Sequence, residues 1–180
     1  NVDGLEWKRQ KWNTAGKVYY KISEWLATFI PNAIVSDARD VQAYYEQKFH
    51  KPSTYIPYGA PVEQETRTDI LNQFNLKPDE YILYVSRMEP ENNAHRVIKA
   101  FEQVETDKKL VMVGDAPYSS DYIKQLKTTT DPRILFTGYV FGNGYRQLQS
   151  HAYAYIQATE VGGTHPALLE GMGYGNCILA

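Results

Sequence analysis

Hydrophobic residues along the chain follow two alternating patterns. Short runs such as YILYV at 81–85 and LVMV at 110–113 are apolar at consecutive positions, which is typical of strands buried on both faces. Between such runs lie stretches of about ten residues with helical spacing, and this alternation predicts parallel βα units. We expect helices over 14–29, 38–48, 66–74, 94–105, 119–128, 142–151 and 165–174, and strands over 33–36, 53–56, 81–86, 109–113, 133–136, 153–157 and 177–179.

The segment PYGAPVEQE at 57–65 predicts a boundary between two domains. Two prolines bracket a glycine there, the composition turns polar, and a new helix is predicted soon afterwards. We expect residues 1–60 to form the carboxy-terminal part of one domain with its linker, and residues 61–180 to form most of a second domain. The chain has no initiator Met and ends in a predicted strand, so we expect a fragment whose fold is incomplete at both ends.

Composition argues against several classes of protein. The 180 residues are 43% hydrophobic, with a formal net charge of −2 and no long basic run, which argues against a nucleic-acid partner. Cys177 is the only cysteine, so no internal disulfide can form, and we expect a reducing, cytoplasmic location. No apolar run approaches the roughly 20 residues that cross a bilayer.

Fingerprints of the common cofactor sites are missing. The sequence contains no GxGxxG, no GxxxxGK[ST] and no GxSxG motif. The four histidines are scattered, and no Asp-x-Asp pair is present to hold a divalent ion on a diphosphate. We therefore expect neither a bound cofactor nor a metal ion.

The stretch EVGGTHPALLEGMG at 160–173 follows a predicted strand and suggests an anion site. Gly162 and Gly163 lack a Cβ atom, so their N–H groups can approach a ligand closely. Pro166 suits the first turn of a helix, whose N–H donors and partial positive charge favour phosphate. Glu170 lies one turn further on the same face, where its carboxylate can bind a ribose diol. The alternative is a buried strand-to-helix turn with Glu170 simply exposed.

Arg87 stands at another predicted strand end. Open α/β sheets bind ligands beyond the carboxyl ends of their strands, and a guanidinium placed there can pair with phosphate oxygens. The alternative is a surface arginine that is paired with Glu89 or Glu91. Asn92 and Asn93 immediately precede a predicted helix, where both suit the N-cap position.

Two further strand ends carry turn residues that permit close approach of a nucleotide. One is VGDAP at 113–117, and the other is FTGYVFGNG at 136–144, which contains Tyr139 and Val140. Each signal is weak by itself. Together, four strand ends in this half of the chain carry turn residues that permit the close approach of a ligand.

Five segments together resemble the family-four glycosyltransferases of the GT-B fold, and within them the rhamnosyltransferase-like branch that builds cell-surface polysaccharides. The resemblance implies an α/β fold with Rossmann-like, doubly wound parallel sheets, in which the first domain binds an acceptor and the second a nucleotide-diphosphate sugar. It also implies transfer that is metal-independent and retains the anomeric configuration. The segments are NVDGLEWKRQKW (1–12), SDARDVQAYY (36–45), IPYGAP (56–61), SRMEPENN (86–93) and TEVGGTHPALLEGMG (159–173).

The resemblance also implies roles for individual residues. Arg87 matches the family's phosphate-binding arginine, and Glu170 matches the second glutamate of its E-x7-E element, which holds the donor ribose. Arg87, His165 and Glu170 are the candidate catalytic residues. The further candidate substrate contacts are Asn92, Tyr139, Val140, Gly162, Gly163 and Thr164.

Two departures from the family pattern affect the same site. Gly162 stands where E-x7-E has its first glutamate, and Glu160 lies two residues too early. Asn92 stands where a lysine commonly accompanies the arginine. Without that lysine, Arg87, His165 and the helix start must supply more of the stabilisation of the leaving diphosphate.

The amino-terminal segment 7–29 carries basic residues interleaved with tryptophan and tyrosine, which suits the surface of an anionic membrane. The alternative is a packed helix whose aromatic side chains fill a core or contact the partner domain. Asp3 and Glu6 are candidates to line the acceptor side, or else to order their own loop. A peripheral location at the inner face of the plasma membrane would follow from membrane docking.

The leading functional hypothesis is a glycosyltransferase that moves a sugar from a nucleotide-diphosphate donor, such as dTDP-rhamnose, to a saccharide or lipid-linked acceptor. A nucleotide-sugar epimerase shares this architecture but needs an acid/base pair at the sugar, and no such pair is evident. A third hypothesis is a piece that binds nucleotide or membrane without turnover, and we expect that of the isolated fragment.

Overall fold

The computed structural model describes residues 6–8, 12–160 and 164–180 of the chain. The chain forms two compact units, and each is described by itself below. The larger unit comprises Ala60–Thr159 with Ala167–Ala180, and the smaller unit comprises Asn1–Gly59 with Glu160–Pro166.

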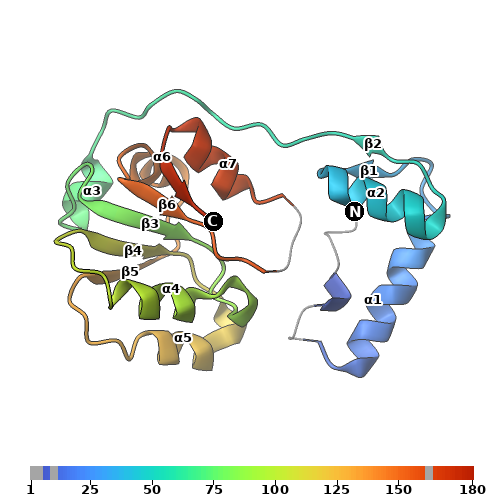
Figure 1. The fold of residues 1–180 in the computed structure, drawn as a ribbon, viewed down its shortest axis with the longest axis horizontal. Coiled ribbons are helices and arrows are strands. Elements are labelled where there is room, and N and C mark those ends of the chain that lie inside the picture. Colours follow the sequence, from blue (N-terminus) through green and yellow to red (C-terminus); the bar gives the residue numbers. More distant parts are fainter. Residues whose placement is uncertain (1–5, 9–11, 161–163) are drawn as a thin grey trace. The chain divides into compact units, whose positions relative to one another are not determined.

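The larger unit is built on a parallel sheet with the strand order β5-β4-β3-β6-β7 (Figure 1). Its centre lies at β3, which pairs with β4 on one side and with β6 on the other. The strands are β3 (Tyr81–Val85), β4 (Lys109–Val113), β5 (Ile134–Gly138), β6 (Ala154–Ile156) and β7 (Cys177–Leu179).

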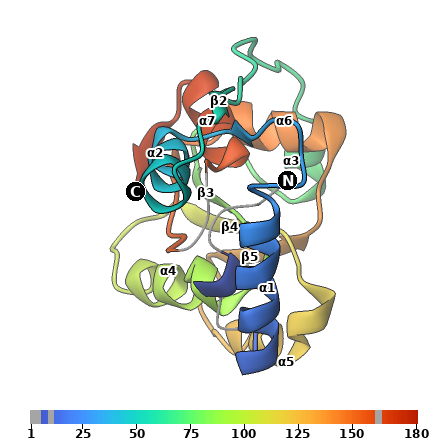
Figure 2. The same ribbon diagram turned by 90° about the vertical axis from the view of Figure 1, so that its right-hand side faces the viewer.

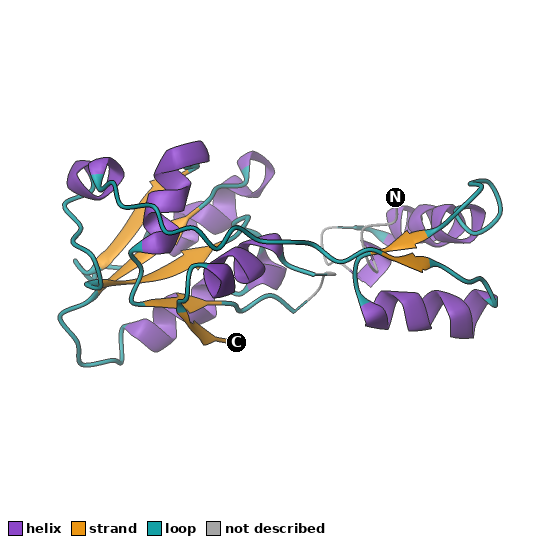
Figure 3. Ribbon diagram, turned by 90° about the horizontal axis from the view of Figure 1, so that it is seen from above, coloured by secondary structure: helices purple, strands orange, loops and turns teal. Residues whose placement is uncertain are grey.

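Helices cover both faces of this sheet (Figures 1 and 3). One face carries α4 and α5, and the other carries α3, α6 and α7, so the unit is a doubly wound α/β layer structure. The helices are α3 (Asp69–Gln73), α4 (Ala94–Phe101), α5 (Ser120–Leu126), α6 (Gly142–Ser150) and α7 (Pro166–Gly173), and two 3-10 turns are η2 (Pro90–Asn92) and η3 (Pro117–Ser119).

Alternate residues of the central strands supply two separate cores. In β4, Leu110 and Met112 pack under α4 and α5, whereas Val111 and Val113 pack under the helices of the opposite face. All four side chains are almost completely buried. Each burial contributes about 1.5–3 kcal/mol, so the continuous apolar run in the sequence stabilises both layers at once.

The smaller unit contains η1 (Glu6–Lys8), α1 (Thr14–Leu26), β1 (Val35–Ser36), α2 (Arg39–Phe49) and β2 (Thr54–Tyr55). Strands β1 and β2 pair in parallel, and α2 connects them (Figure 1). Figure 2 shows α1 and α2 of this unit from another direction. The α1 helix begins after Asn13, whose side chain accepts a hydrogen bond of 2.9 Å from the backbone N–H of Gly16. This is the usual arrangement of an N-cap.

The packing of α1 differs from that of a helix with an apolar buried face. Within α1, the buried residue is Glu24, whose carboxylate lies 3.1 Å from the ammonium of Lys48. By contrast, Val18, Ile22 and Trp25 are each about half exposed. The structure therefore does not place Trp25 in a core of the smaller unit.

The doubly wound α/β class predicted from the sequence is confirmed, and every predicted helix and strand is present. Some predicted ends are wrong. Helix α3 begins at Asp69 rather than at residue 66, because the N–H of Ile70, which would donate to the carbonyl of Thr66 in a longer helix, donates to the side chain of Gln147 at 2.9 Å. Helix α4 ends at Phe101 rather than at residue 105. None of the described helices is long and apolar enough to span a membrane.

Candidate functional site

The strand order creates a switch point between β3 and β6. The chain leaves β3 outward through β4 and β5, and it then returns to pair β6 with the other edge of β3. Ligands of open α/β sheets bind at such a point, beyond the carboxyl ends of the strands. In the larger unit this edge carries the loops that begin at Ser86, Gly114 and Tyr139.

The loops after β3 and β4 are in direct backbone contact. The N–H of Ser86 donates to the carbonyl of Val113 at 3.1 Å, and the N–H of Met88 donates to the carbonyl of Asp115 at 3.4 Å. Gly114 has φ +127°, and a Cβ atom there would lie 1.9 Å from the carbonyl oxygen of Ser86. Only glycine fits this approach, which fixes where the residue after Ser86 can stand.

That next residue is Arg87, the predicted phosphate ligand. Its side chain is 48% exposed, and its Nε lies 3.8 Å from Oε2 of the buried Glu89. The ion pair that the sequence offered as an alternative is therefore present. A half-exposed guanidinium at this edge can still meet an anion, so the pair does not exclude phosphate binding.

Asn92 and Asn93 are both buried, and in the described structure neither side chain caps α4. Asn93 stands at the N-cap position, as predicted, but makes no capping hydrogen bond, whereas Asn92 ends η2. The Nδ2 of Asn92 donates to the carbonyl of Arg87 at 2.7 Å, and the Nδ2 of Asn93 donates to the carbonyl of Ala158 at 2.8 Å. Asn93 is the residue before α4 but adopts a left-handed conformation with φ 58°, so its amide turns toward the neighbouring strand end.

Glu170 accepts a hydrogen bond of 2.6 Å from the hydroxyl of Tyr145. The amide of Gln149 in turn donates to that hydroxyl at 2.8 Å. Burial raises the pKa of Tyr145, and its hydrogen bond to Glu170 acts in the same direction, so the phenol keeps its proton and remains a donor. The Glu170 side chain is half-buried, and the Tyr145 hydroxyl holds one of its carboxylate oxygens in place.

Tyr139 and Val140 follow β5 at the same edge. The Tyr139 hydroxyl donates to the carbonyl of Asp115 at 3.1 Å, and its ring stacks on Phe141 with centroids 5.5 Å apart. Tyr139 is 50% exposed, so the end of β5 presents an aromatic face to solvent. Val140 is half-buried against the core beneath α3 and α6.

Thr164 and His165 belong to the segment that clusters with the smaller unit. The N–H of Thr164 donates to the carboxylate of Asp37 at 3.3 Å, and its hydroxyl donates to the Asp37 carbonyl at 3.3 Å. The amide predicted to face a diphosphate thus has a carboxylate oxygen as its acceptor. Both bonds are long. His165 is half-buried.

Three predicted site residues lie outside the described residues: Asp3, Gly162 and Gly163. Glu6 begins η1.

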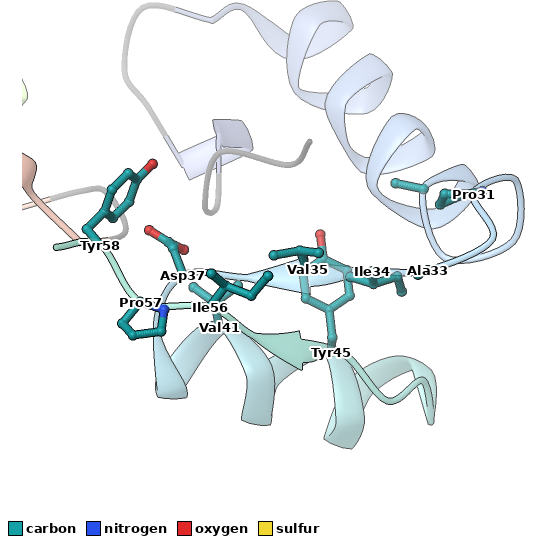
Figure 4. A pocket seen from close by; sticks show the side chains of 11 residues that line it. Pro31, Ala33, Ile34, Val35, Asp37, Val41, Tyr45, Ile56, Pro57 and Tyr58 are labelled. Carbon is teal, nitrogen blue, oxygen red and sulfur yellow. The ribbon is translucent and has the colours of Figure 1, made fainter.

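A pocket of about 500 Å³ lies within the smaller unit (Figure 4). Its lining is mostly apolar, with Asp37, Tyr45 and Tyr58 as the polar residues. Tyr45 projects from α2 toward β1, and its buried hydroxyl has no hydrogen-bond partner among the described residues. Burial raises the pKa of this phenol, which therefore stays protonated and can donate to a bound group.

Sequence reasoning missed Tyr145, Asp37 and the positioning of Asn92. Tyr145 and Gln149 are one helical turn apart, which is a visible signal, but their partner Glu170 is distant in the sequence. Asp37 lies in a segment that carries the family resemblance, yet nothing local connects it to Thr164. Within the described residues, no group of three or more His, Cys, Asp or Glu side chains could hold a metal ion.

Comparisons with solved structures agree with this fold. The Anabaena protein Alr3699/HepE, in complex with UDP and glucose, matches with 18% identity and a TM-score of 0.75 over 88% of this chain and 46% of that protein. A sucrose-phosphate synthase from Thermosynechococcus elongatus matches with 16% identity and a TM-score of 0.77 over 97% of this chain and 46% of its own. A glycosyltransferase from Rickettsia africae matches with 15% identity and a TM-score of 0.71 over 94% of this chain and 48% of its own.

The chain thus spans about half the length of these solved structures. At these levels of sequence identity, the likeness shows a shared fold and nothing more. No curated protein matches the sequence. Residues 1–61 match a family described as a domain of unknown function (DUF1972). Residues 79–180, more than half of the chain and the whole of the larger unit's sheet, match the model of the glycosyl transferases group 1. The chain therefore belongs to the glycosyl transferases group 1 family, with the α/β architecture of the GT-B fold.

Proposed function

We propose that the larger unit binds a nucleotide-diphosphate sugar as the donor of a glycosyl transfer. The observation that carries the proposal is the half-exposed Arg87 at the carboxyl end of β3, next to the switch point of the sheet. Family membership supports it, as does the likeness to Alr3699/HepE, which was solved with UDP and glucose. On this proposal residues 61–180 are the donor domain, and residues 1–60 end the acceptor domain.

The residues at this edge have distinct roles in the proposal. Arg87 pairs with the diphosphate, and Glu170, held by the Tyr145 hydroxyl, accepts hydrogen bonds from the ribose. Tyr139 and Val140 flank the base at the end of β5. Gly162, Gly163, Thr164 and His165 are proposed to meet the diphosphate and sugar.

The proposed reaction breaks the anomeric C–O bond of the donor. Positive charge develops on the sugar and negative charge on the departing nucleoside diphosphate. Groups placed in advance against that diphosphate supply the largest share of the rate, and a guanidinium does this without a metal ion. We propose retention of configuration, with the leaving phosphate taking the acceptor's proton, and rhamnose as the sugar in cell-surface polysaccharide synthesis.

The direct test is titration of the chain with UDP and dTDP. Arg87→Ala should weaken binding of the better ligand by about 1.5–3 kcal/mol, which is about 10- to 150-fold. Arg146→Ala is the matched control, because Arg146 is an exposed arginine of α6 whose charge acts on Glu65. Equal affinities for the wild type and Arg87→Ala would remove Arg87 from the donor site.

A second experiment separates the candidate reactions. The full-length protein should release nucleoside diphosphate from a nucleotide sugar only when an acceptor glycan is present. Conversion of the nucleotide sugar without release would instead favour an epimerase. Binding without either reaction in the full-length protein would favour a non-catalytic role.

We also propose peripheral membrane contact through α1, near a lipid-linked acceptor. The supporting observation is the row of exposed apolar residues at helical spacing, Val18, Ile22 and Trp25. Basic residues at Lys17 and Lys21 flank this row, as in helices that lie on anionic membranes. Flotation with vesicles containing phosphatidylserine tests this. Binding should fall with added salt and in Trp25→Ser, and indifference to both would count against it.

A further inference from the structure

The carbonyl oxygen of Arg87 accepts three hydrogen bonds from its own loop. The donors are the hydroxyl of Ser86 at 3.0 Å, the backbone N–H of Glu89 at 2.8 Å and the side-chain amide of Asn92 at 2.7 Å. A carbonyl oxygen has two lone pairs, so its hydrogen-bonding capacity is fully used here. The backbone of Arg87 is therefore fixed from several directions.

Asn92 is itself held between this carbonyl and the central strand. Its side chain is buried, at 6% exposure, and its own carbonyl accepts a hydrogen bond of 2.5 Å from the hydroxyl of Tyr84 in β3. Burial raises the pKa of Tyr84, so this hydroxyl stays protonated and keeps donating. Asn92 thus links the Tyr84 side chain of β3 to the backbone of Arg87 through two hydrogen bonds.

Glu89 contacts the side chain of the same arginine. It is 2% exposed, and its Oε2 lies 3.8 Å from the Nε of Arg87. A buried carboxylate beside one edge of a guanidinium restricts the directions in which the planar group can point.

We propose that Asn92 is a positioning residue for Arg87, and that Glu89 assists it by orienting the guanidinium. The inference rests on the proposed donor site, and it changes the role of Asn92 from a direct diphosphate contact to an indirect one. Asn92 stands where the family commonly has a lysine, and a neutral amide cannot replace that charge. What it supplies is a fixed arginine, so that less conformational freedom is lost when the diphosphate binds.

Two ligands that differ only in the diphosphate test this. Asn92→Ala should weaken binding of UDP about tenfold, as expected for one lost hydrogen bond that acts through Arg87. Uridine, which has no diphosphate, should bind within about twofold of the wild type. Tyr81→Phe is the control for general loosening, because it removes a buried hydrogen bond of 2.6 Å to Leu148 from the opposite, amino-terminal end of β3.

The double variant Arg87→Ala/Asn92→Ala distinguishes positioning from direct contact. If Asn92 acts through Arg87, the double variant should bind UDP as Arg87→Ala does, within about twofold. Losses that multiply would show that Asn92 contacts the ligand itself and would overturn the proposal. Equal weakening of UDP and uridine by Asn92→Ala would also overturn it, because a purely structural role predicts that result.

Glu89→Gln adds a test in which two explanations of the role of Glu89 predict opposite changes in UDP affinity. Removal of a negative charge near an anion should tighten UDP binding if Glu89 acts only by its charge. If Glu89 orients Arg87, Glu89→Gln should weaken UDP binding, and tighter binding would contradict that role.

A wild-type chain that binds neither UDP nor dTDP would refute the donor site itself. Weaker binding in Arg87→Ala but not in Asn92→Ala would refute only the positioning.

Discussion

Gly114→Ala tests how the two central loops of the proposed donor site are held together. Gly114 follows β4 with φ +127°, and an added Cβ atom would lie 1.9 Å from the carbonyl oxygen of Ser86. Real Cβ atoms essentially never come closer than 3.0 Å to such an atom, so one of the two backbone segments must move by roughly 1 Å. That movement shifts Ser86, the residue immediately before Arg87.

Two terms give the expected loss of stability. Holding a non-glycine residue in this backbone conformation costs on the order of 1–3 kcal/mol. Separating the segments also lengthens the hydrogen bonds from Ser86 to Val113, at 3.1 Å, and from Gly114 to Gly138, at 2.9 Å. Each of these contributes about 0.5–1.5 kcal/mol. We expect Gly114→Ala to lower the free energy of unfolding of the larger unit by about 2–6 kcal/mol.

Urea unfolding followed by circular dichroism measures this change, and UDP titration measures its effect on the site. Gly175→Ala is the matched control, because Gly175 also has a positive φ, of 80°, but no atom lies within 4 Å of its added Cβ. It should cost about 1–2 kcal/mol from backbone strain alone and leave UDP affinity unchanged. If Gly114→Ala were no less stable than Gly175→Ala and bound UDP normally, the close approach of the two loops would be refuted.

Three further predictions concern other parts of the chain. Hydrogen bonds from Arg67 lower the pKa of Glu65 from 4.5 to about 2, so the pair stabilises the folded state above pH 4.5, and this stabilisation is lost as the pH falls toward 2. Glu65→Gln should therefore lower the melting temperature at pH 7, with a difference from wild type that vanishes near pH 2; a constant difference would contradict this. Tyr145→Phe removes the donor to Glu170 and the acceptor of Gln149, and it should cost about 1–3 kcal/mol in chemical unfolding; a change below about 0.5 kcal/mol would argue against the network. Chelation with EDTA should leave UDP affinity unchanged, and a marked loss would refute metal-independent donor binding.

The helices and strands, which depend on residues close together in the sequence, could be predicted from the sequence. Consecutive apolar residues such as 110–113 predicted strands covered on both faces, and the two cores on either side of β4 confirm this. Pro166 predicted the start of a helix, and α7 begins there. Helix boundaries were less certain, because the start of α3 depends on a hydrogen bond from the N–H of Ile70 to the distant Gln147, in which helix propensity has no part.

The arrangement of the candidate site was decided by the tertiary structure. Strand order places β6 beside β3, and nothing within either strand specifies that neighbour. The Tyr145–Glu170 hydrogen bond and the Gly114–Ser86 approach join residues that are 25 or more positions apart, so their geometry exists only once the sheet has formed. Asn92 is the clearest case: its sequence position suited both an N-cap and a ligand contact, and packing against Tyr84 and Arg87 determined which way its amide points. Local periodicity therefore determined the elements of this protein, whereas long-range packing determined which side chains meet at the ends of its strands.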